Sequence, residues 1–283
     1  MVPFDRYMVE VESGLRMHVM EAGEGDPVIL FHGNPTWGFL YRKVAAELSG
    51  ESYRLIMPDL IGLGFSDRPD DADQHTLENH GRWMAAFVEV LQLDAPTAVV
   101  QDWGGPIGLL ALSRAGQSLS GLVVMNTSLM PPREGFKPTT FHRLFSTRLG
   151  EMARRYLGLP QRMLGWAQGD RSSISGDVSR AYQYPLTGRR GGEAVTALVR
   201  MVPSSLDHPT VAGLSQVKAY VESFDGRSAI VWGDEDPVLG RLRRRHERLL
   251  PDAKVTATEA GHFLQEEVPA EIAQAIRYVA GDA

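Results

Sequence analysis

The chain has 283 residues, of which 43% are hydrophobic and 23% charged, a composition typical of a globular protein long enough to bury a large core. Its net charge of −6 argues against nucleic acid or an anionic membrane as the main partner, and the absence of cysteine excludes disulfides, thiolate metal sites and a cysteine nucleophile. The N-terminus has no signal-peptide pattern, and no apolar run approaches the ~18 residues of a membrane span. We therefore expect a cytoplasmic protein, monomeric by default.

The chain begins with a predicted β-hairpin, in which Tyr7–Val11 and Leu15–Met20 flank the turn residues Ser13 and Gly14. Six short apolar runs follow: Pro27–Phe31, Arg54–Met57, Thr97–Val100, Leu122–Met125, Ala229–Trp232 and Lys254–Ala257. Such runs are typical of strands buried on both faces, and the intervals between them are long enough for helices. The pattern predicts an α/β fold with a mostly parallel central sheet flanked by helices, and with the hairpin at the sheet edge.

The alternation of strand and helix breaks after Met130. Residues 131–206 contain Pro131 and Pro132, Arg-rich amphipathic stretches and Gly/Ser loops, but no run typical of a buried strand. We therefore predict a helical cap domain over residues 131–206, inserted after the sixth strand, and a core domain formed by residues 1–130 and 207–283. In open α/β sheets, ligands bind outside the carboxyl ends of the strands, where our candidate chemical residues also fall.

The stretch VVQDWGGPIG, residues 99–108, has the outline of a strand, a sharp turn and a helix. This elbow presents the nucleophile in α/β-hydrolases, usually a serine, and here its tip is Asp102. An aspartate is already an anion at neutral pH and needs no base before it attacks. Attack on a saturated carbon that bears a leaving group gives an ester, which water can hydrolyse to return Asp102 intact. The residue therefore favours alkyl halides or epoxides as substrates.

Two further residues complete a candidate triad. His262 follows the last predicted strand and fits the base that activates water. Its acidic partner is expected on the loop after a neighbouring strand, where Asp236 lies deepest in the loop GDEDP, whereas the end of the preceding strand offers Asn126 but no acid. The order nucleophile, acid, histidine is that of α/β-hydrolases.

A leaving halide is an anion and needs hydrogen-bond donors. Trp103 supplies an indole N–H, and Asn34 in HGNPTW supplies a side-chain amide. The backbone N–H groups of Asn34 and Trp103 are expected to form the oxyanion hole of the hydrolytic step. The sequence has no dinucleotide-binding turn after the first strand and no cluster of metal ligands, so we expect no cofactor and no metal.

These motifs resemble those of the haloalkane dehalogenases in order and approximate spacing, from about residue 27 to the end of the chain, whereas the predicted cap matches less clearly. The stretches concerned are HGNPTWGFLYR (32–42), PDLIGLGFSDRP (58–69), QDWGGPIGL (101–109), MNTSLMPP (125–132), GDEDPVLG (233–240) and AGHFLQEE (260–267). The resemblance implies an α/β-hydrolase fold and hydrolysis of the carbon–halogen bond of a small halogenated hydrocarbon to a primary alcohol, a halide ion and a proton. It also implies an alkyl ester on Asp102 as intermediate, with Asp236 as the acid, His262 as the base and Trp103 as a halide ligand.

Two questions stay open at this point. In the family the second halide ligand is either the asparagine of the HGN motif, here Asn34, or a tryptophan of the cap, for which Trp166 is the candidate; we favour Asn34. The alternative activity is that of an epoxide hydrolase, which would use the same triad and cap tyrosines as proton donors. The tyrosines available in the predicted cap are Tyr156, Tyr182 and Tyr184. The triad alone also leaves a luciferase-like relative open.

Arginines are concentrated in the stretch RLRRRHER, Arg241–Arg248. Because the chain is acidic overall and the spacing is helical, we interpret this run as a solvated helix face rather than a site for phosphate or nucleic acid. A fluoroacetate-type dehalogenase would need arginines beside Asp102 to bind a carboxylate substrate, and no such pattern occurs there.

Overall fold

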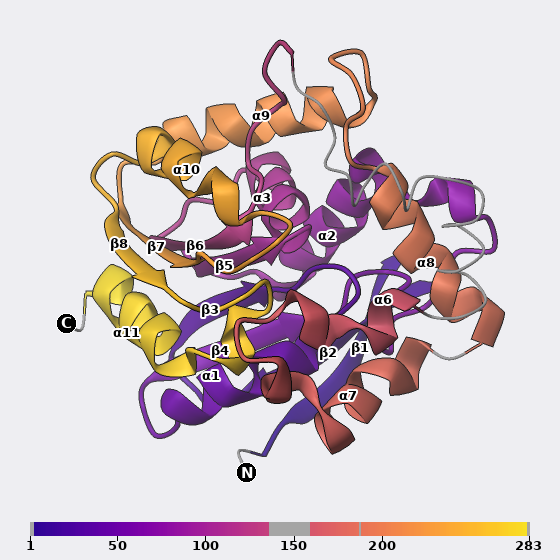
Figure 1. Ribbon diagram of the computed structural model, residues 1–283, viewed down its shortest axis with the longest axis horizontal. Helices are drawn as coiled ribbons and strands as arrows, with labels where there is room; N and C mark the ends of the chain where they lie inside the picture. Colours follow the sequence, from indigo (N-terminus) through magenta and orange to yellow (C-terminus); the bar gives the residue numbers. More distant parts are fainter. Residues whose placement is uncertain (1–2, 136–158, 187, 282–283) are drawn as a thin grey trace.

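In the computed structural model, which describes residues 3–135, 159–186 and 188–281, eight strands form one sheet of order β1-β2-β4-β3-β5-β6-β7-β8 (Figure 1). The strands are β1 Asp5–Glu12, β2 Leu15–Ala22, β3 Asp26–Phe31, β4 Tyr53–Pro58, β5 Thr97–Asp102, β6 Gly121–Thr127, β7 Arg227–Gly233 and β8 Lys254–Thr258. The β1–β2 hairpin lies at one edge and pairs antiparallel with β4, and all pairs from β4 to β8 are parallel. The predicted fold class is confirmed.

Alternation along each strand divides the core into two clusters, one on each face of the sheet. In β5, Val100 packs in one cluster and Val99 in the other. All seven residues of β6 are buried, as expected for a strand covered on both faces. The last strand, β8, differs from this expectation: it is largely exposed because it is the edge strand of the sheet.

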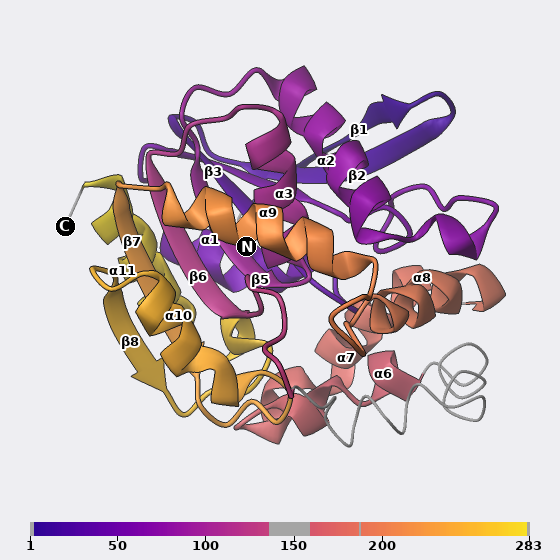
Figure 2. The ribbon, with the colours of Figure 1, turned by 90° about the horizontal axis from the view of Figure 1, so that it is seen from above.

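Helices cover both faces of the sheet, as Figures 1 and 2 show. On one face lie α2 (Leu77–Leu91), α3 (Gly104–Arg114) and α9 (Thr210–Glu222). On the other lie α1 (Arg42–Glu47) and α11 (Pro269–Ala280). Helix α10 (Arg243–Leu249) connects β7 to β8. None of the helices in the described ranges is long and apolar enough to cross a membrane.

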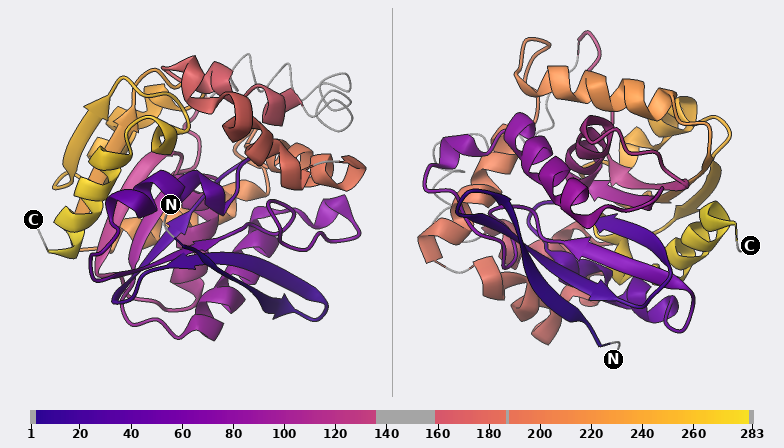
Figure 3. Two further views of the ribbon diagram at one scale, coloured as in Figure 1. Left: turned by 90° about the horizontal axis from the view of Figure 1, so that it is seen from below. Right: turned by 180° about the vertical axis from the view of Figure 1, so that it is seen from behind.

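The segment between β6 and α9 contains, in its described part, the α-helices α6 (Leu159–Arg162), α7 (Gly176–Gln183) and α8 (Gly188–Arg200). They lie together at one end of the sheet, as both views of Figure 3 show. Side chains of the core reach this segment: Trp37 Nε1 donates to the Ala181 carbonyl at 3.2 Å. The division into a core and a cap stays a prediction, and residues 136–158 of the predicted cap lie outside the described residues.

Candidate active site

The candidate nucleophile occupies a sharp turn between β5 and α3. Asp102 has φ of +47°, in the left-handed region that non-glycine residues rarely adopt, and Thr127 Oγ1 donates to its carbonyl at 2.6 Å. Two residues close to the turn in space, Gly33 and Gly104, are glycines because a larger side chain would not fit. A Cβ on Gly33 would collide with the Asp102 carboxylate, and a Cβ on Gly104 would collide with the Phe31 carbonyl. The elbow predicted from the sequence is therefore present, with its carboxylate held at the tip.

The structure brings the three predicted triad residues together. His262 is buried in the loop after β8, with Nδ1 at 2.8 Å from Asp236 Oδ2 and Nε2 at 3.5 Å from Asp102 Oδ2. Since Asp236 accepts at Nδ1, the imidazole ring is fixed with Nε2 directed to the candidate nucleophile. This orientation is the one that a base acting next to Asp102 needs.

Asp236 is itself fixed by neighbours that the sequence did not indicate. Asn126 Nδ2 donates to Asp236 Oδ2 at 2.8 Å, and the backbone N–H of Val238 donates to Oδ1 at 2.7 Å. The Asn126 amide also exchanges two hydrogen bonds of 2.8 Å with the backbone of Gly233, at the end of β7. The signal that could have found this role is a polar residue at the end of the fully buried strand β6.

The charges of the triad are strongly coupled. Burial lowers the pKa of His262, but the Asp236 and Asp102 carboxylates outweigh burial and raise this pKa to about 10. Burial raises the pKa of Asp236, and the neighbouring His262, Asn126 and Val238 N–H outweigh it, so this pKa is lowered. The two carboxylates therefore favour the protonated form of the His262 ring in the free site.

The loop that carries His262 is bound to the 3₁₀ helix η3 (Leu164–Ala167) of the predicted cap and to the residue after it. The His262 backbone N–H donates to the Ala167 carbonyl at 2.7 Å. Gln168 accepts from the Phe263 N–H at 2.9 Å and donates to the Phe263 carbonyl at 3.1 Å. A Cβ on Gly261 would collide with Ala167 and Gln168, so the two segments meet at backbone distance.

Donors for an anion lie on both sides of Asp102. The Asn34 backbone N–H, one of the expected oxyanion donors, already donates to Asp102 Oδ1 at 2.7 Å. The Asn34 side chain donates from Nδ2 to the Val195 carbonyl at 3.1 Å, which leaves its second N–H, while Oδ1 is buried without a partner. Trp103 lines the cavity described below, and its indole N–H makes no hydrogen bond to any residue of the described ranges.

Trp166, the other candidate halide ligand, is placed differently. It lines the same cavity from η3, but it is 65% exposed and has the Arg171 guanidinium 4.8 Å from its ring centre. Water competes for an anion at such an exposed indole, so this position is poorer for a halide than that of Trp103.

A cavity of about 440 Å³ opens over the triad, within the size range of small-molecule sites. Its lining is mostly apolar. The described residues that contribute are Asn34, Pro35, Asp102, Trp103, Pro106, Ser128, Met130, Pro132, Met163, Leu164, Trp166, Ala167, Val199, Val202, Pro203, Leu214, Pro237, Val238, Leu239, Arg241, Leu242, Arg245, His262 and Phe263. The cavity thus combines a carboxylate, a candidate base and N–H donors without a described acceptor, in surroundings that suit an apolar substrate.

The arginine run only partly forms the solvated face that we expected. Arg243 lies at the surface, paired with Asp234 at 2.9 Å and Glu247 at 3.3 Å. Arg241 and Arg245 both line the cavity, and since Arg241 is exposed and Arg245 is half-buried, the prediction of a solvated face is wrong for Arg245. Their spacing of four residues was the available signal, because it places both side chains on one helix face.

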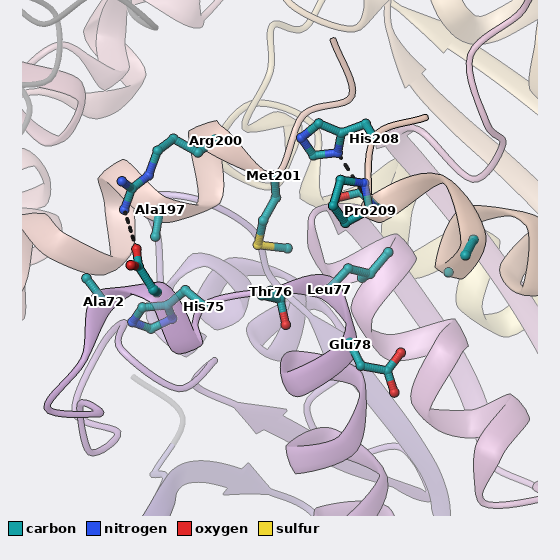
Figure 4. A pocket seen from close by; sticks show the side chains of 14 residues that line it. Ala72, His75, Thr76, Leu77, Glu78, Ala197, Arg200, Met201, His208 and Pro209 are labelled. Carbon is teal, nitrogen blue, oxygen red and sulfur yellow. Dashed lines mark hydrogen bonds and ion pairs between the residues drawn. The ribbon is translucent and has the colours of Figure 1, made fainter. Parts of the chain in front are cut away.

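A second pocket, of about 200 Å³, lies among α2, α8 and α9 (Figure 4). Arg200 and Asp73 meet across it at 3.9 Å, and none of the triad residues lines it. Within the described ranges, no group of three or more histidine or acidic residues is arranged to hold a metal ion. The larger cavity is therefore the candidate active site.

Comparison with known proteins defines the class first: the family model for the alpha/beta hydrolase fold matches residues 26–269. Over 285 aligned residues, the chain is also 33% identical to a haloalkane dehalogenase of Mycobacterium marinum, covering 97% of this chain and 93% of that protein. Within the α/β-hydrolases, the chain belongs to the haloalkane dehalogenase family.

Solved structures agree with this assignment. A mutant of haloalkane dehalogenase DatA from Agrobacterium tumefaciens C58 has a TM-score of 0.85 and 26% identity, covering 98% of this chain and 97% of that one. The epoxide hydrolase CorEH has a TM-score of 0.78 and covers 99% of both chains, but at 18% identity it shows a common fold alone.

Proposed function

We propose that this protein hydrolyses the carbon–halogen bond of haloalkanes to a primary alcohol, a halide ion and a proton. The observation that carries the proposal is the carboxylate of Asp102 at the tip of the elbow, with His262 Nε2 at 3.5 Å, facing a mostly apolar cavity. Family membership supports it.

The first step is displacement at carbon. Asp102 Oδ1 accepts the Asn34 N–H, so Oδ2 is the oxygen that attacks the halogen-bearing carbon. The new C–O bond forms as the carbon–halogen bond breaks, and the halide leaves with the bonding electrons. The indole N–H of Trp103 and the second amide N–H of Asn34 stabilise the departing charge, whereas Trp166 lies at the exposed side of the cavity.

The second step hydrolyses the ester and regenerates the free enzyme. In the ester, Asp102 no longer carries the charge that favours the protonated His262 ring, so the ring releases its proton to solvent. His262 Nε2 then takes a proton from water, and the resulting hydroxide attacks the ester carbonyl carbon of Asp102. The backbone N–H groups of Asn34 and Trp103 stabilise the tetrahedral oxyanion, and Asp236 stabilises the imidazolium. Collapse releases the alcohol and restores the Asp102 carboxylate.

The epoxide hydrolase alternative requires tyrosines directed into the cavity, and the described ones are elsewhere. Tyr182 is fully buried and donates to Glu266 Oε1 at 2.5 Å. Tyr184 is 70% exposed and packs against Phe65, and neither residue lines the cavity. Tyr156 lies outside the described residues. The site therefore favours a substrate whose leaving group needs anion donors rather than a proton.

The test is bromide release from 1-bromobutane and 1-bromohexane by the wild-type protein and by Asp102→Ala. We expect the variant to release no bromide above background, because the attacking oxygen is gone. Styrene oxide serves as the comparison substrate. Diol formation from styrene oxide without bromide from either bromoalkane would refute the proposal, and an unchanged melting temperature of the variant would show that its fold is intact.

A further inference from the structure

Two cations line the candidate active-site cavity, on the segment that follows Asp236. Arg241 lies in the 3₁₀ helix η6 (Gly240–Leu242), and Arg245 lies one turn further on, in α10. Among the described lining residues, only these two, Asp102 and His262 have ionisable side chains. Since Arg241 is exposed, the arginines mark the solvent side of the cavity.

The charge of Arg245 is not neutralised by any carboxylate of the described ranges. Its Nη2 donates to the Pro131 carbonyl at 3.0 Å, and its Nε is buried without a partner. Two acids of the segment between β7 and β8, Asp234 and Glu247, both pair with Arg243 instead. A half-buried guanidinium therefore lines the cavity with N–H donors that have no acceptor among the described residues.

Further cations surround this guanidinium. Burial lowers the pKa of Arg245, and the positive charges of Arg133 and Arg248 lower it further. An arginine nevertheless stays charged in proteins, so the repulsion is relieved only by an anion. A carboxylate suits the position because it accepts two parallel N–H bonds from one guanidinium.

We propose that the natural substrate carries a carboxylate at the end remote from its halogen, and that Arg245, assisted by Arg241, binds this group. The inference rests on the proposed function. The negative charge of Asp102 repels the carboxylate, so the halogen-bearing carbon lies at Asp102 and the anionic end at the arginines. The reaction is unchanged: an ω-halocarboxylate and water give an ω-hydroxycarboxylate, a halide ion and a proton.

The experiment compares ω-bromocarboxylates of four to ten carbons with the matching uncharged ω-bromoamides, at low and at high NaCl. For the chain length that fits best, we expect kcat/KM for the carboxylate to exceed that for the amide about tenfold at low salt, with the preference reduced at high salt. Arg245→Gln should abolish the preference for the carboxylate by raising KM for the carboxylate alone. Arg245→Lys should keep part of the preference, because it keeps the positive charge. Arg241→Gln should reduce the preference less than Arg245→Gln does.

Arg244→Gln is the matched control, because Arg244 is exposed in the same run and does not line the cavity. Equal kcat/KM for carboxylate and amide in the wild type would overturn the inference and leave the proposed function intact. A fall in kcat for both substrates on Arg245→Gln would assign the cluster to halide release and would also overturn it. Absence of bromide from every substrate would instead refute the proposed function.

Discussion

His262 lies between two carboxylates, and this position links its charge to the state of Asp102. In the free site both carboxylates raise the pKa of His262, to about 10. In the proposed mechanism Asp102 becomes an ester and loses its negative charge, so one of the two carboxylates that raise the pKa of His262 no longer does so. The pKa of His262 then falls, so the ring becomes a base at the step that needs one. Formation of the ester thereby prepares its own hydrolysis.

The substitution His262→Phe should separate displacement of the halide from hydrolysis of the ester. The variant retains the attacking carboxylate but lacks the base, so the alkyl ester on Asp102 should accumulate. Intact-protein mass spectrometry after incubation with 1-bromohexane should show one added hexyl group, and peptide mapping should place it on Asp102. Absence of an adduct in a folded His262→Phe variant would contradict the roles proposed for Asp102 and His262. Asp102→Ala under the same conditions is the negative control.

The secondary-structure elements place the site at the ends of neighbouring strands, where chain segments approach each other at backbone distance. β5 delivers Asp102, β6 delivers Asn126, and the loops after β7 and β8 deliver Asp236 and His262. The Asn126 amide joins the ends of β6 and β7 through Gly233. The candidate acid Asp236 is therefore fixed by the ends of two strands as well as by its own loop, through the Val238 N–H, which is what a rigid site requires.

The close approach of Gly33 to the elbow can be tested directly. Gly33→Ala places a methyl group where the Asp102 carboxylate lies, so the carboxylate or its loop must shift. A misplacement of this kind costs about 100-fold in rate, and we expect kcat/KM for 1-bromohexane to fall by about that factor.

Gly50→Ala is the contrasting control. Apart from its chain neighbours, no described residue has an atom within 4 Å of the added methyl group, and the φ of +86° strains an alanine. The free energy of unfolding of Gly50→Ala should therefore fall by about 1 kcal/mol, while its kcat/KM stays that of the wild type. If Gly33→Ala keeps wild-type kcat/KM, the close approach has no catalytic role.

For the whole molecule, the buried triad makes stability depend on pH. The pKa of His262 is about 10 in the folded protein, against an ordinary value of 6.5. The folded state therefore binds more protons than the unfolded state between pH 6.5 and 10. The stabilisation is complete below pH 6.5 and is lost as pH rises toward 10, with a slope of up to about 1.4 kcal/mol per pH unit.

Urea unfolding of the wild type and of His262→Phe at several pH values across this window measures the effect. The free energy of unfolding of the wild type should fall with rising pH more steeply than that of the variant. Parallel curves would show that His262 does not carry a raised pKa in the folded protein.

The sequence predicted the sheet and the candidate triad because both follow local rules. Buried strands appear as apolar runs, and Asp102, Asp236 and His262 stand directly after them. The sequence did not predict the roles of Asn126 and Arg245, because these depend on contacts between segments that are distant in the chain. Asn126 was dismissed as lacking a charge, although its donor groups are what Asp236 uses. Arg245 was interpreted as solvated, since no local pattern shows which helix face meets a cavity formed partly by the predicted cap.

The contact of Gly261 with Ala167 and Gln168 limits how such an enzyme can diversify. The segment that shapes the substrate cavity also holds the backbone of the base, through the bond from His262 to Ala167. Recombination that exchanged residues 131–206 for those of a relative would alter selectivity and displace the base together. We therefore expect selectivity to change with less loss of activity through point substitutions at the cavity wall, for example in α10, than through exchange of the whole predicted cap.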